Sequence, residues 1–155
     1  MAVTDLASIT RLAGEVAAIH EGRGRPEAAI GEFRRTAVLV PLDERGGLWT
    51  TAHGGVWWIH AFSDESALAR FALARGHAGS GSGWPFVSVL GARLLDVVVP
   101  AVAGPTGVAL DVGGETPFFL PPVAGIVPEG AAVDAGGVTA EDGAGGEGGT
   151  GEARR

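Results

Sequence analysis

An apolar strand that leads directly into a capped helix is the feature that most constrains the fold of this chain. Side chains alternate along a strand, so residues 56–62 divide into two faces. One face carries Val56, Trp58, His60 and Phe62, and the other carries Trp57, Ile59 and Ala61. Because bulky side chains stand on both faces, we expect a central strand rather than a half-solvated edge strand.

The residues after this strand predict a helix at about 64–75. Ser63 is placed to accept a backbone hydrogen bond as the N-cap residue, and Asp64 and Glu65 put negative charge in the first turn, where the helix dipole favours it. Four residues recur at helical spacing: Leu68, Phe71, Ala72 and Arg75. Gly76 is a suitable residue to end the helix.

Two helices are expected before the strand. Thr4 or Asp5 can cap the first, which ends near Gly22 and carries an amphipathic stripe of Leu6, Ile9, Ala13, Val16 and His20. Pro26 suits the first position of the second helix. The expected buried side of that helix consists of Ala29, Ile30 and Phe33.

The remaining apolar runs predict further strands. Residues 36–42 and 48–52 are joined to each other and to residues 56–62 by turn-like sequences, which predicts an antiparallel meander. Later strands are expected at 84–90, 107–112 and 117–121. The run at 91–99 fits either a short helix ended by Pro100 or a continued strand.

These elements predict an α+β fold with two N-terminal helices and a mostly antiparallel sheet that has a helix packed on one face. We place this domain at residues 1–128. Residues 129–155 lack aromatic side chains and are rich in Gly, Ala, Glu and Asp. Such a segment buries too little apolar surface to offset the entropy of ordering, so we expect a disordered acidic tail.

Composition narrows the classes of function. The chain has no cysteine, which excludes disulfides and cysteine-based metal sites, and its formal net charge of −7 argues against a nucleic-acid partner. No apolar segment reaches the length of a membrane span and no secretory signal pattern is present, so we expect a cytoplasmic protein without membrane association. The oligomeric state stays open.

The motifs that could carry chemistry lack their required context. The Gly-Ser-Gly-Ser-Gly run at 79–83 is not followed by the Gly-Lys-Ser/Thr of a phosphate loop and lies between a helix and a strand, so we interpret it as a linker. The chain has four histidines, His20, His53, His60 and His77, with no pair at metal-ligand spacing in a helix. We therefore assign no metal or cofactor.

His60 is the one histidine that invites a catalytic interpretation, because it stands on the strand between Trp58 and Phe62. A Ser-His-Asp triad could be assembled from Ser82 or Ser88, His60, and Asp96 or Asp111. No Gly-x-Ser-x-Gly elbow between a strand and a helix supports it. We interpret His60 as a hydrogen-bonded, partly buried residue and assign no catalytic residue.

The tryptophans offer a different clue. Trp49, Trp57, Trp58 and Trp84 all fall in predicted strands or at their starts. Trp58 is expected in the core. Tryptophan is enriched at binding hot spots, and a sheet covered on one side has an open face. The predicted partner-binding residues are Trp57, Ile59 and Trp84.

The order of elements resembles the N-terminal domain of the SseB-like proteins, a bacterial family often labelled by analogy with type III secretion. The resemblance covers roughly residues 5–127. It is carried by Val40-Pro41, by the run Phe62-Ser-Asp-Glu-Ser-Ala-Leu68, by Leu94-Leu95 after Gly91, and by the closing Gly107-x-Ala-Leu110 strand. Members often have Asn-Pro-Gly where this chain has Asp111-Val-Gly113. The resemblance supplies no catalytic residue.

We therefore expect a non-enzymatic protein-interaction or accessory module with an unknown protein partner. Two alternatives remain: a small hydrolase that uses His60, and a ligand-sensing domain with a pocket between sheet and helix near His60. Polar groups that converge near His60 would favour either alternative. An apolar patch without a cleft would favour the interaction module.

Overall fold

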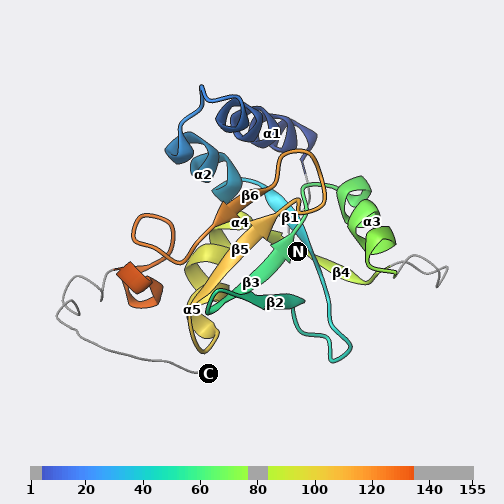
Figure 1. Ribbon diagram of the computed structural model, residues 1–155, viewed down its shortest axis with the longest axis vertical. Coiled ribbons are helices and arrows are strands. Elements are labelled where there is room, and N and C mark those ends of the chain that lie inside the picture. Colours follow the sequence, from blue (N-terminus) through green and yellow to red (C-terminus); the bar gives the residue numbers. More distant parts are fainter. Residues whose placement is uncertain (1–4, 77–83, 135–155) are drawn as a thin grey trace.

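The computed structural model describes residues 5–76 and 84–134 and has the predicted α+β architecture (Figure 1). The first half contains α1 (Leu6–His20), α2 (Pro26–Arg34), β1 (Ala37–Pro41), β2 (Thr50–His53), β3 (Val56–Ala61) and α3 (Glu65–Ala74). The second half contains β4 (Phe86–Leu90), α4 (Gly91–Arg93), the π-helical turn η2 (Leu94–Val98), α5 (Val99–Ala101), β5 (Thr106–Leu110), β6 (Phe118–Leu120) and the 3-10 turn η3 (Glu129–Ala131).

The described strands form a four-stranded sheet in the order β2-β3-β5-β6 and a two-stranded sheet of β1 and β4. The ladder between β3 and β5 is parallel, with Ile59 opposite Val108, and the other ladders are antiparallel. The sheet is therefore mostly antiparallel, as predicted. β3 lies between β2 and β5, which confirms that residues 56–62 form a central strand.

The predicted three-strand meander is wrong in one pairing, because β1 forms its ladder with β4 instead of β2. Pairing toward the hairpin does begin, since Leu42 bridges Leu48 and the Trp49 N–H donates to the Pro41 carbonyl at 2.9 Å. It stops at Pro41, which has no N–H to donate. Leu39 instead joins β1 to the end of β3 through two hydrogen bonds of 2.8 Å with Phe62.

One face of the sheets packs on α1, α2 and the helical segment from α4 to α5, which encloses the larger core. The fully buried side chains of this core include Leu12, Phe33, Val38, Val40, Ile59, Leu94, Leu95, Val108, Leu110 and Leu120. A second core lies on the opposite side beneath α3, at the right in Figure 1. It contains Leu39, Phe62, Ala67, Leu68, Phe71, Ala72 and Trp84. β3 thus has buried side chains on both faces.

Two helix predictions need correction in detail. In α1 the cap is Asp5, which accepts from the Ser8 N–H at 3.2 Å. The predicted stripe is correct at Val16, which is buried, and wrong at Leu6 and Ala13, which are exposed. The buried residues are Ser8, Leu12, Val16 and Ala18. Leu6 lies at the first helical position and is 76% exposed, so apolar spacing alone did not locate the contact face.

In α3 the N-cap is Asp64, whose carboxylate accepts from the Ala67 N–H at 2.8 Å, and not Ser63 as predicted. Ser63 serves another contact: its N–H and hydroxyl donate to the two Asp111 carboxylate oxygens at 2.9 and 2.8 Å. Burial raises the pKa of Asp111, and the bonds from Ser63 oppose that effect. Gly76 follows α3 with a φ of +82°, as expected for the residue after a helix end.

The ambiguous run at 91–99 is helical and continues through Pro100 into α5. The π-helical turn η2 precedes Pro100 and changes the hydrogen-bond register, which accommodates a residue without an N–H. Gly91 opens this segment because a Cβ there would lie 2.0 Å from the Phe33 carbonyl oxygen. The close approach of α4 to α2 therefore requires glycine.

The end of the domain extends beyond residue 128. Residues 129–131 form η3, and Ala132 packs in the larger core. The Val133 N–H donates to Pro122 at 2.8 Å, and Asp134 accepts from the Ala124 N–H at 2.7 Å. The first residues assigned to the tail thus contact the domain, while residues 135–155 and the linker predicted at 79–83 lie outside the described residues.

Phe71→Ala is expected to lower the free energy of unfolding by about 3–5 kcal/mol, because it removes a buried ring from the second core. Leu73→Ala on the same helix is the matched control, since Leu73 is 69% exposed, and it should change stability by less than about 0.5 kcal/mol. Denaturant titration measures both. Similar losses in the two variants would contradict the packing of α3.

Candidate functional site

Five aromatic rings from four segments of the chain form one cluster at α3. The members of this aromatic cluster are Trp49, His60, Phe62, Phe71 and Trp84. Phe71 contacts the other four rings, and Trp49 has ring centroids 5.0 Å from both His60 and Trp84 and 5.6 Å from Phe71, all in edge-to-face geometry. Such contacts stabilise aromatic pairs beyond the burial of their area.

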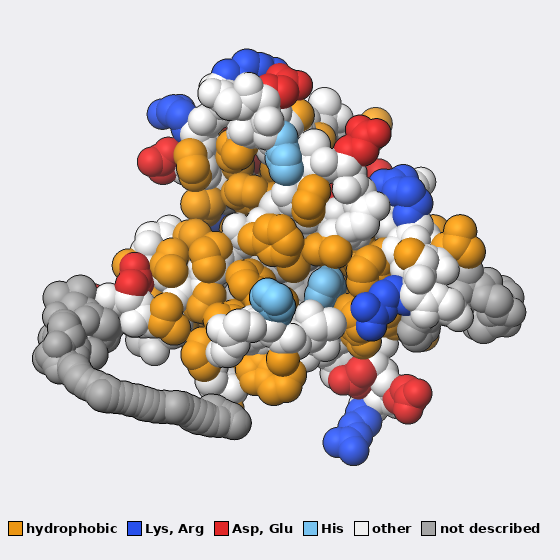
Figure 2. All heavy atoms as spheres, in the orientation of Figure 1, with side chains coloured by type: hydrophobic (Ala, Val, Ile, Leu, Met, Phe, Trp, Pro, Cys, Tyr) orange, Lys and Arg blue, Asp and Glu red, His pale blue; other side chains and the backbone are white. Residues whose placement is uncertain are grey.

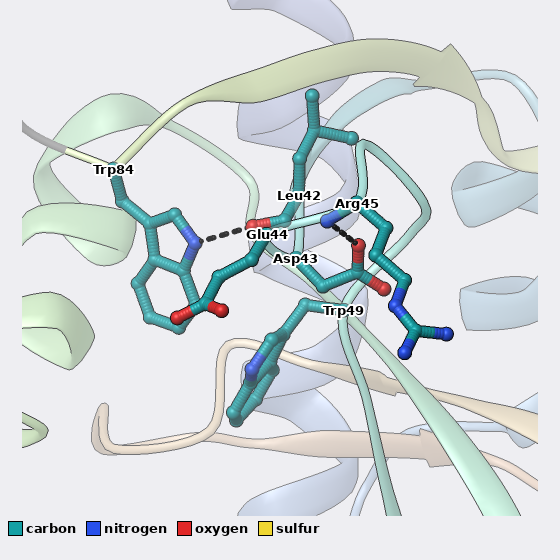
Figure 3. Close-up of a pocket in the computed structure, with 6 residues that line it drawn as sticks. All are labelled: Leu42, Asp43, Glu44, Arg45, Trp49 and Trp84. Atoms are coloured by element: carbon teal, nitrogen blue, oxygen red, sulfur yellow. Dashed lines mark hydrogen bonds between the residues drawn. The ribbon is translucent and has the colours of Figure 1, made fainter.

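The outer side of this cluster opens into a cleft of about 510 Å³, shown in Figure 3. We call it the indole cleft, and its lining residues are Leu42, Asp43, Glu44, Arg45, Trp49 and Trp84. Trp84 forms one wall and is held in place because its indole N–H donates to the Leu42 carbonyl at 2.8 Å. Trp49 forms a second wall, nearly perpendicular to Trp84 at an interplanar angle of 78°.

The loop between β1 and β2 supplies the charged groups of the indole cleft. One Asp43 oxygen accepts from the N–H groups of Arg45 and Gly47 at 2.8 and 2.9 Å, which fixes the loop. Glu44 makes no ion pair with any described residue, and in Figure 3 its side chain extends toward the side where the two indoles lie. The Arg45 guanidinium extends away from them.

Trp49 already carries a cation on its ring. The guanidinium carbon of Arg75, at the end of α3, lies 4.8 Å from the Trp49 ring centroid and 5.7 Å from that of Phe71. Arg75 does not line the indole cleft. The contact shows that the electron-rich Trp49 ring accepts a guanidinium in this protein.

His60 forms no hydrogen bond with a carboxylate of the described residues. Its Nε2 lies 2.9 Å from the Thr51 hydroxyl, and its Nδ1 is buried without a hydrogen bond. Burial, with a smaller effect of the Arg75 charge, lowers the pKa of His60 to about 4. The ring is therefore neutral at pH 7 and a weak base, whereas a general base works best with a pKa near the operating pH.

The proposed Ser-His-Asp triad does not assemble. Asp96 is paired with Arg34, with one guanidinium bond of 3.1 Å, and Asp111 is bonded to Ser63. Ser88 lies on β4 with its hydroxyl buried and without a hydrogen bond, so it is not hydrogen-bonded to His60. Ser82 and His77 lie outside the described residues. Within 5–76 and 84–134, no group of three His, Asp or Glu side chains could hold a metal ion.

The three predicted partner-binding residues are not brought together. Trp57 is 44% exposed near the start of β3, but Ile59 is 1% exposed, because α1, α2 and η2 cover its face of the sheet. Trp84 is 8% exposed and packs in the second core. The predicted open patch of Trp57 with Ile59 is therefore wrong, and Trp84 belongs instead to the wall of the indole cleft.

Sequence reasoning missed the charged loop of the cleft and the role of Trp49. The signal was present, since acidic Asp43-Glu44 and aromatic Trp49 flank one short turn. This local pattern did not predict a site by itself, because Trp84 and Arg75, which contact Leu42 and Trp49, come from distant parts of the chain.

Comparisons with protein-family models, with curated proteins and with solved structures found no match to the chain. None of the described helices is long and apolar enough to cross a membrane. The geometry of the site is therefore the basis for proposing a function.

The buried neutral His60 predicts a pH dependence of stability. The folded pKa of about 4 lies below the unfolded value of about 6.5, so this contribution is complete above pH 6.5 and is lost as the pH falls toward 4. Between pH 7 and pH 4, wild type should lose about 3 kcal/mol more unfolding free energy than His60→Gln. Denaturant titrations measure this, with His53→Gln as a control at an exposed histidine. If the unfolding free energies of wild type and His60→Gln changed with pH in parallel, a lowered pKa of buried His60 would be contradicted.

Proposed function

We propose that the protein is a non-enzymatic interaction module that binds an arginine or lysine side chain of a partner protein in the indole cleft. The observation that carries this proposal is the pair of perpendicular indoles, Trp49 and Trp84, with ring centroids 5.0 Å apart beside a negatively charged loop. Aromatic rings that enclose a space next to carboxylates are a recurrent way to recognise cations.

The charge of the cleft suits a cationic ligand. Asp43 and Glu44 contribute two negative charges and Arg45 one positive charge, and the whole chain has a formal net charge of −7. The Glu44 carboxylate makes no ion pair with a described residue, so an incoming cation breaks no existing salt bridge. The long-range field of an acidic protein also favours encounter with a basic segment.

The walls of the cleft are fixed before any ligand arrives. Trp84 is held by its hydrogen bond to Leu42, and Trp49 is held by its contacts with His60 and Phe71. A preformed site avoids the cost of ordering side chains on binding. One cation–π contact contributes only about 0.5–2 kcal/mol, so a single side chain would bind weakly and the partner would need neighbouring contacts.

The hydrolase alternative has less support. His60 bonds to Thr51, and the aspartates that could orient a histidine are engaged by Arg34 and Ser63. The resemblance to SseB-like proteins favours the same conclusion, because it supplies no catalytic residue. Membership of that family is part of this proposal.

A defined peptide tests the proposal without knowledge of the natural partner. Titration of acetyl-Gly-Arg-Gly-amide is expected to shift the indole N–H resonances of Trp49 and Trp84 in a saturable way. The matched peptide with neutral citrulline in place of arginine should bind at least about fivefold more weakly, which corresponds to about 1 kcal/mol of lost cation–π and charge interaction.

Two variants locate the interaction. Glu44→Gln should weaken the arginine peptide about two- to fivefold, as expected for loss of one exposed charge pair, whereas Glu27→Gln on α2 should have no effect. Equal binding of the arginine and citrulline peptides would contradict cation recognition. Shifts that leave Trp49 and Trp84 unchanged would place the binding site elsewhere.

A further inference from the structure

A second hollow lies on the face of the four-stranded sheet that α3 leaves open, and it is separate from the indole cleft. Its volume is about 330 Å³. We call it the sheet hollow, and its lining residues are Thr51, His53, Trp58, His60, Ala109, Val112 and Phe119. In Figure 2 hydrophobic side chains gather over this part of the sheet around histidine side chains. No Asp, Glu or Arg of the described residues lines it.

The sequence shapes the walls of the sheet hollow. Strand alternation puts Trp58 and His60 of β3 on this face, and Ala109 lies opposite His60 on β5. Gly107 is required beside Trp58, because a Cβ there would lie 2.7 Å from the indole ring. The Trp58 ring can therefore lie across β5, where it meets the exposed Phe119 ring edge-to-face at 5.7 Å.

The side chains of His60 and Thr51, which both line this hollow, form a hydrogen bond with each other. The His60 ring is neutral at pH 7 and carries a single N–H, and its Nδ1 is buried without a partner. A proton on Nδ1 would be an unpaired buried donor, which proteins avoid. The proton therefore belongs on Nε2, which donates to the Thr51 hydroxyl oxygen at 2.9 Å.

This assignment fixes the role of Thr51. A hydroxyl that accepts from His60 keeps its own proton available as a donor, and Thr51 lines the sheet hollow. Besides the imidazoles of His53 and His60, the hollow thus offers the aromatic rings of Trp58 and Phe119 and one hydroxyl donor, with no Asp, Glu or Arg among its described lining residues. Its volume is at the lower end of the range for small-molecule sites.

We propose that the sheet hollow binds a small neutral ligand that packs an apolar ring against Trp58 and Phe119 and accepts a hydrogen bond from the Thr51 hydroxyl through a carbonyl oxygen. No Asp, Glu or Arg of the described residues lines the hollow to pair with an ionic ligand, which favours a neutral molecule. The site is independent of the proposed cation recognition, because the two share no lining residue.

The test compares two probes of nearly equal shape on the full chain. Acetophenone carries the carbonyl oxygen, and α-methylstyrene replaces that oxygen with a methylene group. NMR titration should show saturable shifts of Thr51, Ala109 and Val112 with acetophenone, and binding of α-methylstyrene should be about fivefold weaker.

Two variants test whether the Thr51 hydroxyl causes the preference for acetophenone over α-methylstyrene. Thr51→Val should remove the preference for acetophenone, so that both probes bind alike, whereas Thr50→Val on the opposite face of β2 should retain it. The proposal is overturned if acetophenone gives no saturable shifts at these residues, if both probes bind wild type equally, or if the preference persists in Thr51→Val. If a variant fails to fold, the comparison of acetophenone with α-methylstyrene in the wild-type protein still tests the proposal.

Discussion

The edge-to-face packing of Trp49 against Trp84 and His60 is the contact on which the arrangement of this protein depends. Trp49 immediately precedes β2, Trp84 precedes β4, and His60 lies on the central strand β3. The three rings therefore join the two sheets directly, and the Trp84 hydrogen bond to Leu42 ties the end of β1 to the same point. Aromatic pairs in this geometry prefer defined distances and angles, so the cluster fixes position as well as burying area.

The cluster also separates two cavities on one side of the molecule, the indole cleft and the sheet hollow. α3 covers the end of the sheet where Phe62 and Phe71 pack, and it leaves the surface around Trp58 and Phe119 open. His60 stands at the boundary, with Phe71 stacked on its ring at 5.4 Å and Thr51 bonded to its Nε2. The charged indole cleft and the neutral sheet hollow are thus built from one set of neighbouring side chains but present different chemistry.

Local sequence signals predicted the elements well and their partners poorly. The three helices α1, α2 and α3, the central position of β3 and the α+β class followed from spacing and from bulky side chains on both strand faces, although the cap of α3 is Asp64 and not the predicted Ser63. The pairing of β1 with β4 could not be predicted, because it joins segments about fifty residues apart. Ile59 was predicted on an open face because strand alternation separates the two faces of a sheet but does not show which face the helices cover. The structure buries Ile59.

Hydrogen exchange of the Trp84 indole proton tests the central claim most directly, since this proton links the aromatic cluster to β1. If the cluster is a fixed wall, the Trp84 indole N–H should exchange about as slowly as the most protected backbone amides of β3 and β5, through global unfolding. The indole N–H of half-exposed Trp57 provides the fast reference in the same spectrum. Exchange of Trp84 as fast as that of Trp57 would contradict a rigid cluster and the preformed cleft that rests on it.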